Sequence, residues 1–285
     1  MARFLIVPQW QGSPAARAMH LVDGADAIAG DLPRAATVRV EVPTSAGEAQ
    51  ETGIRRFSAL ARTGAALTEA LAAAPLGEPV VVVGGDCGVA VPAIAHAAAA
   101  AESLAVVWFD AHGDLHTPLT SPSGAFAGMA LRAVIESLPL SGSGSVPPER
   151  VFLAGAREID EAEEDALAHS GITHVDVAAL GRGGRGARDA GEEDGAQDLA
   201  AAVAATGATA LYVHVDLDVL DPTTLAGVAL PVPFGLSLDE LLSAIAALRA
   251  RIPLVGASIS GFAPASPAAA IDDLGAILRV VGALA

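Results

Sequence analysis

The chain contains no lysine, a single cysteine and few aromatic side chains. All 16 of its basic residues are therefore arginines, they stand against 33 acidic residues, and the formal net charge is −17. Nucleic acids and anionic membranes are bound through basic patches, so this balance argues against both as partners. The lone Cys87 also excludes an intramolecular disulfide bond.

Long apolar runs are missing as well. The stretch from 89 to 101 contains Pro92 and His96, and it falls short of the ~20 apolar residues of a spanning helix. The apolar run at residues 1–8 is too short for a signal peptide, so we expect a cytoplasmic protein without a membrane span. No linker divides the sequence, and residues 1–285 are expected to form one domain.

The sequence does contain a regular alternation of short β-branched runs and longer Ala- and Leu-rich segments, which is typical of βαβ units. Strands are predicted at eight places: 3–7, 37–42, 79–83, 104–109, 150–153, 173–177, 210–215 and 254–259. Helices are predicted at 14–29, 50–74, 89–101, 127–137, 160–169, 196–206, 237–249 and 267–283. The segments 141–148 and 181–198 are predicted to be surface loops, because Gly, Ser and charged residues dominate them.

Several predicted strands are apolar throughout, as 80–83 shows, which indicates burial on both faces. The expected fold class is therefore α/β, a three-layer α/β/α sandwich around a central, mostly parallel sheet of about eight strands. An eight-stranded (β/α) barrel is the structural alternative, because strand count alone does not separate the two.

Acidic residues follow three of the buried strands directly. Asp86 comes after 80–83 and two glycines, Asp110 after 104–109, and Asp216 after 210–215. In open α/β sheets, ligands bind beyond the carboxyl ends of the strands, where these residues would meet. Buried carboxylates cost several kcal/mol each unless they are paired or bound to metal, and no arginine lies in the three motifs. The sequence therefore predicts a metal site.

The spacing within the motifs supports this prediction. In extended backbone, alternate side chains point to the same side, so Asp216 and Asp218 can converge, as can Asp110, His112 and Asp114. Oxygen donors with an imidazole suit Mn²⁺, whereas a thiolate from Cys87 would shift the preference towards Zn²⁺, Fe²⁺ or Co²⁺. A small buried hydrophobe is the alternative role for that cysteine. Metal-bridging water is readily deprotonated, so the expected chemistry is hydrolysis by hydroxide attack.

In this order, the motifs resemble those of the arginase/agmatinase ureohydrolase family. Its Gly-Gly-Asp-His motif appears as 84–87 with Cys87 last, its Asp-Ala-His-x-Asp as 110–114, and its Asp-x-Asp-x-x-Asp-Pro as 216–222. The resemblance covers most of the chain. It implies the three-layer α/β/α fold, a binuclear manganese centre, hydrolysis of guanidino or amidino groups, and assembly into trimers or hexamers.

The resemblance also implies roles for individual residues. One metal ion would be bound by Cys87, Asp110, Asp114 and Asp216, and the other by Asp110, His112, Asp216 and Asp218. The substrate's amino-acid end would meet His116, which replaces the usual Asn, together with Ser123, Asp160 and Glu163. Asp114 and His116 are the candidate catalytic residues. Solvated surface acids are the alternative interpretation of Asp160 and Glu163.

Three positions depart from the family pattern. Cys87 replaces the first metal-binding His, Ala127 a His expected to shuttle protons, and Gly261 the Glu expected to bind the guanidinium. A cysteine ligand and a small residue in place of the shuttle His are also features of Nω-hydroxy-L-arginine hydrolases, which the segment 155–161 resembles. We therefore expect an amidinohydrolase of a guanidino or hydroxyguanidino compound.

Two alternatives remain open at this point. The first is a catalytically degenerate family member that serves as a metal- or ligand-binding scaffold, which the loss of the Glu and the His favours. The second is a hydrolase of a neutral amide or formimino substrate, for which a guanidinium-binding carboxylate is unnecessary.

Overall fold

The computed structural model describes residues 2–75, 77–142, 144–181 and 194–285. Eight strands lie close to the predicted places: β1 (Arg3–Val7), β2 (Thr37–Arg39), β3 (Val80–Gly84), β4 (Leu104–Phe109), β5 (Val151–Ala154), β6 (Thr173–Val175), β7 (Ala210–Asp216) and β8 (Leu254–Ser260). They form one sheet in the order β2-β1-β3-β8-β7-β4-β5-β6. Every pairing between these strands is parallel. The edge strands β2 and β6 are at opposite ends of this order, so the sheet is open and the barrel alternative is wrong.

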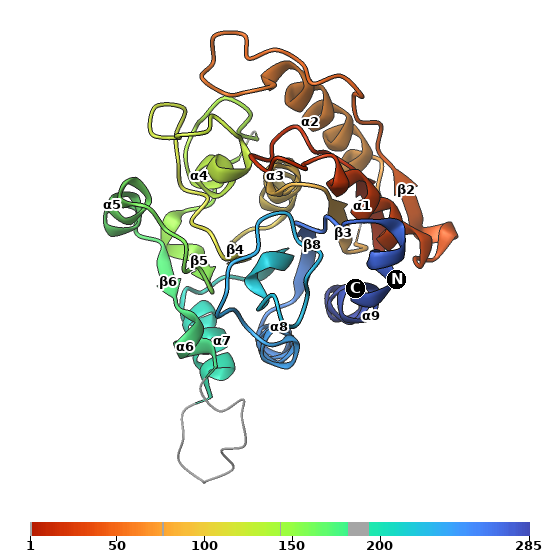
Figure 1. The fold of residues 1–285 in the computed structure, drawn as a ribbon. Coiled ribbons are helices and arrows are strands. Elements are labelled where there is room, and N and C mark those ends of the chain that lie inside the picture. Colours follow the sequence, from red (N-terminus) through yellow and green to blue (C-terminus); the bar gives the residue numbers. More distant parts are fainter. Residues whose placement is uncertain (1, 76, 143, 182–193) are drawn as a thin grey trace.

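Nine helices in the described residues connect and cover the strands: α1 (His20–Gly30), α2 (Phe57–Ala72), α3 (Ala90–Ala100), α4 (Ala130–Ile135), α5 (Glu161–Ser170), α6 (Val177–Leu180), α7 (Gly195–Ala205), α8 (Leu238–Arg251) and α9 (Pro267–Leu284). Figure 1 shows them on both sides of the sheet. One core cluster packs helices α1, α6, α7, α8 and α9 against one face of the sheet. A second core cluster packs helices α2, α3, α4 and α5 against the other face. The predicted three-layer α/β/α sandwich is confirmed, with an all-parallel sheet.

Burial explains why the central strands are apolar throughout. Each residue of β3, β4 and β7 is buried, because helices cover both faces of the sheet there. Small side chains fill much of the space: Ala105, Ala244 and Ala257 are almost fully buried in one core cluster, and Ala90 and Ala130 in the other. The low aromatic content is therefore compatible with two well-filled interfaces between helices and sheet.

Some predicted boundaries were wrong for identifiable reasons. The helix predicted at 50–74 begins only at Phe57, because Gln50, Glu51, Gly53 and Arg56 have positive φ angles that an α-helix does not allow. The helix predicted at 14–29 begins at His20.

The predicted loop 181–198 is also shorter than expected at its end. The Asp194 carboxylate accepts a hydrogen bond from the backbone of Ala196 and begins α7 at Gly195. Most of that predicted loop, 182–193, lies outside the described residues. The strand predicted at 173–177 ends at Val175, because the Asp176 side chain caps the short helix α6.

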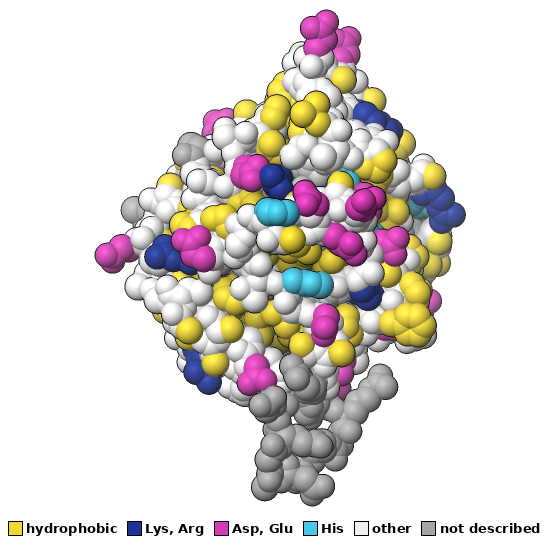
Figure 2. All heavy atoms as spheres, turned by 90° about the vertical axis from the view of Figure 1, so that its left-hand side faces the viewer, with side chains coloured by type: hydrophobic (Ala, Val, Ile, Leu, Met, Phe, Trp, Pro, Cys, Tyr) yellow, Lys and Arg dark blue, Asp and Glu magenta, His cyan; other side chains and the backbone are white. Residues whose placement is uncertain are grey.

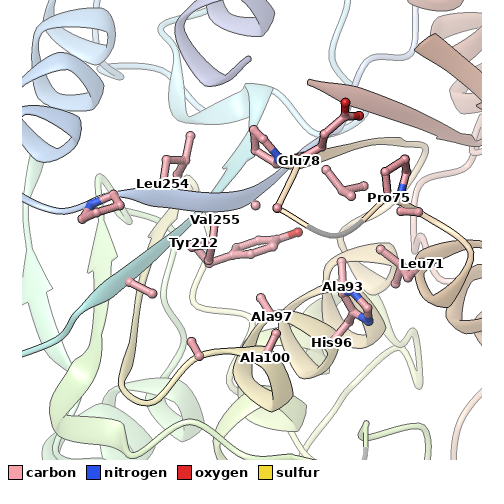
Figure 3. Close-up of a pocket in the computed structure, with 18 of the residues that line it drawn as sticks. Leu71, Pro75, Glu78, Ala93, His96, Ala97, Ala100, Tyr212, Leu254 and Val255 are labelled. Carbon is pink, nitrogen blue, oxygen red and sulfur yellow. The ribbon is translucent and has the colours of Figure 1, made fainter. Parts of the chain in front are cut away.

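The two ends of the sheet differ in what they present. The strands β3, β4 and β7 end in the acidic motifs at the carboxyl edge, as predicted. At the amino edge, a cavity of about 670 Å³ opens beside the first residues of β3, β7 and β8. Figure 3 shows the Tyr212 ring lying across this cavity, with Ala93, Ala97 and Leu254 around it. Its lining is largely apolar.

No helix among the described residues has both the length and the apolar composition that crossing a membrane requires.

Candidate metal centre

The carboxyl edge of the sheet holds a pocket of about 290 Å³ whose inner end is lined by buried acidic groups. The pocket contacts all six predicted metal ligands: Cys87, Asp110, His112, Asp114, Asp216 and Asp218. It also contacts His116, Ser123 and Glu163, whereas Asp160 lies beside it, exposed, at the start of α5. The structure thus brings together the residues that the sequence singled out. On the side that carries α5 and β6, Asp and Glu side chains gather around His side chains (Figure 2).

Short segments at the strand ends position these carboxylates. Asp110 Oδ1 accepts the backbone N–H of His112 at 2.8 Å, and Asp216 Oδ1 accepts that of Asp218 at 3.0 Å. Asp218 Oδ1 in turn accepts the backbone N–H of Ala111 at 3.1 Å, which links the two motifs. Both sequence motifs are therefore tight turns, and each turn directs a second acidic or imidazole side chain into the same pocket.

His112 lies between two of the carboxylates. Its Nδ1 is 3.1 Å from Asp218 Oδ2 and 3.4 Å from Asp110 Oδ1. Burial lowers the pKa of His112, but the hydrogen bonds to Asp110 and Asp218 outweigh burial and raise it to about 12. Without a metal ion, this imidazolium is the only cation that pairs directly with the six ligands, among the described residues.

Asp114 has no such partner, and Asp218 shares the His112 imidazolium with Asp110. Burial, and then the neighbouring negative charge of Asp110, raise the pKa of Asp114 well above its usual range. Asp114 Oδ2 is buried without a hydrogen-bond partner, and the residue itself has a strained φ of 52°. Burial, followed by the charge of Asp216, likewise raises the pKa of Asp218. An unpaired buried oxygen and several uncompensated acids fit a site for divalent cations.

Cys87 belongs to this group rather than to the apolar core alone. Its Sγ lies 2.9 Å from Asp216 Oδ2 and 3.8 Å from Asp110 Oδ2. Burial and the surrounding carboxylates raise the pKa of the thiol well above its usual range, so a thiolate here requires a bound cation. Cys87 begins the short 3₁₀ helix η2 (Cys87–Val89), capped by the Asp86 side chain.

Asp86, the third acid of the sequence prediction, has a different role. Its oxygens accept hydrogen bonds from Gln9 Nε2, the Gly12 backbone and the Gly88 backbone, at 2.9 to 3.0 Å. Burial raises its pKa to about 6 despite these bonds. A side chain on Gly12 would come within 2.4 Å of Asp86 Oδ1, so this contact requires glycine. Asp86 therefore joins the loop after β1 to the centre.

The outer end of the pocket is built around His116. Its Nε2 lies 3.2 Å from Asp160 Oδ2 and 4.0 Å from Glu163 Oε1, and its Nδ1 lies 3.2 Å from Thr120 Oγ1. Asp160 and Glu163 form a capping box at the start of α5, and the buried Glu163 also accepts the backbone N–H of Leu115. Glu163 is buried and is therefore not a solvated acid, whereas Asp160 remains exposed and stays compatible with that alternative.

Sequence reasoning missed four residues around the centre. Trp108 Nε1 donates to Asp110 Oδ2 at 3.1 Å, and Ser260 Oγ donates to Asp216 Oδ2 at 3.0 Å. Arg157 donates to the backbone carbonyls of five residues, among them Asp218 and Val219, and so fixes the segment after β7. His214 lies in β7, two residues before Asp216. The period of two in a strand was the available signal for Trp108, His214 and Ser260.

The comparisons with known proteins agree with this geometry. The arginase family model matches residues 19–277. The arginase of Bacillus subtilis (strain 168) is 37% identical over 165 residues, an alignment that covers 56% of this chain and 53% of that protein. The chain thus spans about half the length of the curated relatives it matches.

Two solved structures resemble the whole described chain. The arginase of Bacillus caldovelox has a TM-score of 0.80 at 25% identity and covers 99% of this chain and 97% of its own. The Entamoeba histolytica arginase in complex with L-ornithine has a TM-score of 0.81 at 20% identity, with the same coverage, and shows the shared fold. Because the family model matches most of the sequence and the acidic motifs meet in one pocket, the chain belongs to the arginase family.

Proposed function

We propose that this protein is a binuclear metallohydrolase that cleaves a C–N bond of a guanidino compound, and that an N-hydroxyguanidino compound is its preferred substrate class. The family and the pocket of buried carboxylates support the first part. The residues present fit two divalent ions, because Asp110 lies between Cys87 Sγ and His112 Nδ1, and Asp216 lies between Cys87 Sγ and the backbone of Asp218. Bound ions of this kind supply Lewis acidity and lower the pKa of water to about 7.

Gly261 carries the second part of the proposal. It has a φ of 88°, and a Cβ at this position would lie 2.1 Å from Asp216 Oδ1. A side chain there would be strained by the positive φ and would have to displace the Asp216 carboxylate, and the glycine itself offers no group at this place to pair with a guanidinium. A paired charge of this kind is worth about 1.5–3 kcal/mol.

An N-hydroxyguanidine suits such a pocket better than a guanidine does. N-hydroxylation lowers the basicity of the guanidine, so more of it is neutral near pH 7 and less pairing with a carboxylate is needed. The chain's own residues then have simple tasks: Asp114 accepts and holds a proton at its unpaired oxygen, and the pair of His116 with Asp160 contacts the far end of the substrate. Ser123 lines the pocket beside them.

The test is a substrate panel with protein reconstituted with Mn²⁺, in which matched guanidino and N-hydroxyguanidino compounds differ by one oxygen atom. We expect hydroxyurea release from the hydroxylated members at a kcat/KM at least about tenfold above urea release from their partners. Metal-free protein is the control. Release of neither product would refute the amidinohydrolase proposal. Release of formamide from formimino compounds would instead support a hydrolase of formimino substrates.

The other expectations stay predictions. They are two Mn²⁺ ions as the resident metals, a single domain over 1–285, a cytoplasmic location and a trimeric or hexameric assembly.

A further inference from the structure

His214 is a buried imidazole directly beneath the centre, at a position for which the family pattern gives no ligand. We propose that His214 is a metal ligand, which binds the ion on the Cys87 side together with Cys87 and Asp110. This inference rests on the metal centre of the proposed function, but not on its substrate.

The donor atoms of Cys87, Asp110 and His214 lie close together. One donor atom each from Cys87, Asp110 and His214 can be chosen such that all three lie within 4.8 Å of one another, and all three residues are buried. Bonds from zinc-like ions to sulfur and nitrogen are about 2.3 and 2.0 Å long, so two ligands of one ion lie up to about 4.3 Å apart. Small rotations of these side chains are enough to bring the three donors onto one ion.

The His214 ring directs one nitrogen to the centre and the other to Ser258. His214 Nδ1 lies 2.7 Å from Ser258 Oγ, which leaves Nε2 as the nitrogen directed to the centre. Nε2 lies 3.4 Å from Ser260 Oγ, and that hydroxyl lies 3.5 Å from Cys87 Sγ. A histidine ligand commonly donates its other ring N–H to a fixed partner, which sets its tautomer and direction. Ser258 provides such a partner.

Neighbouring side chains hold the ring in place. Trp108 packs against it with ring centroids 3.8 Å apart, and the same Trp108 donates to Asp110 Oδ2. His214, Trp108 and Asp110 therefore form one packed unit. Nε2 contacts the Ser260 hydroxyl at 3.4 Å, but that hydroxyl donates its proton to Asp216 Oδ2 at 3.0 Å. With Nδ1–H donated to Ser258, Nε2 keeps its lone pair for a cation.

The arrangement has a simple interpretation. The family pattern has a His where this chain has Cys87, and His214 brings an imidazole back to the same ion from the adjacent strand β7. The ion would then have sulfur, nitrogen and oxygen donors, a set that favours Zn²⁺, Co²⁺ or Fe²⁺ over Mn²⁺. The other ion, on the His112 side, would keep mainly oxygen donors. We therefore infer that the two positions differ in metal preference.

Cadmium NMR tests this inference directly. The full chain is loaded with ¹¹³Cd²⁺, and couplings from each cadmium to imidazole ring protons and to cysteine β-protons are recorded. We expect two signals: one coupled to Cys87 and to the His214 ring, and one coupled to the His112 ring alone. A cysteine-coupled signal without any imidazole coupling, or no cysteine-coupled signal, would overturn the proposal.

The variant His214→Asn sharpens the result. We expect it to lose only the imidazole coupling of the thiolate-bound ion and to bind that ion at least about tenfold more weakly, since even changes behind a ligand cost about 10–100-fold. The His112 signal is the internal control for the fold. Unchanged affinity at both sites, within twofold, would contradict the proposal.

If His214→Asn does not fold, the couplings of the unaltered protein decide alone. None of these measurements uses activity. A His214 coupling without hydroxyurea release would therefore refute the substrate proposal and leave His214 as a metal ligand. Hydroxyurea release without a His214 coupling would refute only the assignment of His214 as a ligand.

Discussion

Each of the two ends of the strands has a cavity beside it, and only the cavity at the carboxyl edge has the properties of a reaction site. The cavity at the amino edge is larger, about 670 Å³ against about 290 Å³, and its lining is mostly apolar. The pocket at the carboxyl edge contains several buried acids, an unpaired carboxylate oxygen and a residue with strained φ. Uncompensated buried charge, rather than volume, distinguishes the candidate metal site from the other cavity.

The largest expected effect concerns the carboxylate between the two metal positions. Asp216→Asn removes one negative charge that both ions would share, so we expect a loss of metal affinity of at least about 100-fold, and of activity in proportion. Metal content after dialysis and kcat with the substrate panel measure this. Asp165→Asn, an exposed acid on α5, is the matched control. An Asp216→Asn protein with two tightly bound ions would contradict the assignment of the centre.

A smaller effect on metal affinity is expected at Trp108, which contacts a proposed metal ligand without being one. Trp108→Phe keeps the ring against His214 and removes the hydrogen bond to Asp110 Oδ2, so we expect metal affinity to fall by about tenfold. Trp10→Phe makes the same change at a tryptophan whose ring stacks under Arg56. Equal effects of the two substitutions on metal affinity would show that Trp108 acts through general stability instead.

The stability of the metal-free protein should depend on pH in a defined direction. Because the folded pKa of His112 is raised to about 12, its pairing contributes fully below about pH 6.5 and is lost as the pH rises further. The raised pKa values of Asp114 and Asp218 act with the same sign, since their ionisation in the folded chain becomes costly as the pH rises. Burial lowers the pKa of His214 to about 3, and this acts oppositely, but only below about pH 6.5.

Above that pH we therefore expect the metal-free protein to become less stable and the metal-bound protein to change less. The difference in Tm between the two forms should grow by several degrees from pH 6.5 to 8.5, because about 1 kcal/mol shifts the Tm of a chain of this size by about 2–4 °C. Differential scanning calorimetry of both forms measures it. A Tm of the metal-free form that rises over this range would contradict the described charge balance.

The smallest effect is expected at the amino edge. Ala97→Leu places a larger side chain from α3 into the apolar cavity, so we expect the free energy of unfolding to rise by up to about 1 kcal/mol. Urea denaturation measures this change, and kcat/KM should stay within twofold. A tenfold loss of activity would show that the two edges communicate and would break the comparison.

The sequence predicted the fold and the meeting of the acidic motifs in one pocket, because strong local patterns encode both. Apolar runs buried on two faces specify central parallel strands, and acids placed directly after them must meet at one edge. Boundaries such as Phe57 were missed because positive φ angles at residues such as Arg56 leave little trace in helical periodicity. The roles of Ser260 and Arg157 were missed since each depends on contacts between segments that are distant in the sequence, whereas Trp108 contacts Asp110 only two residues away.

The backbone at Gly261 restricts which side chains this position could accept. Its φ of 88° strains any other residue, and a side chain there would have to displace the Asp216 carboxylate. A carboxylate introduced at this place would therefore disturb the candidate metal centre at the same time. Laboratory evolution of this pocket should vary the backbone around residue 261 together with the side chain.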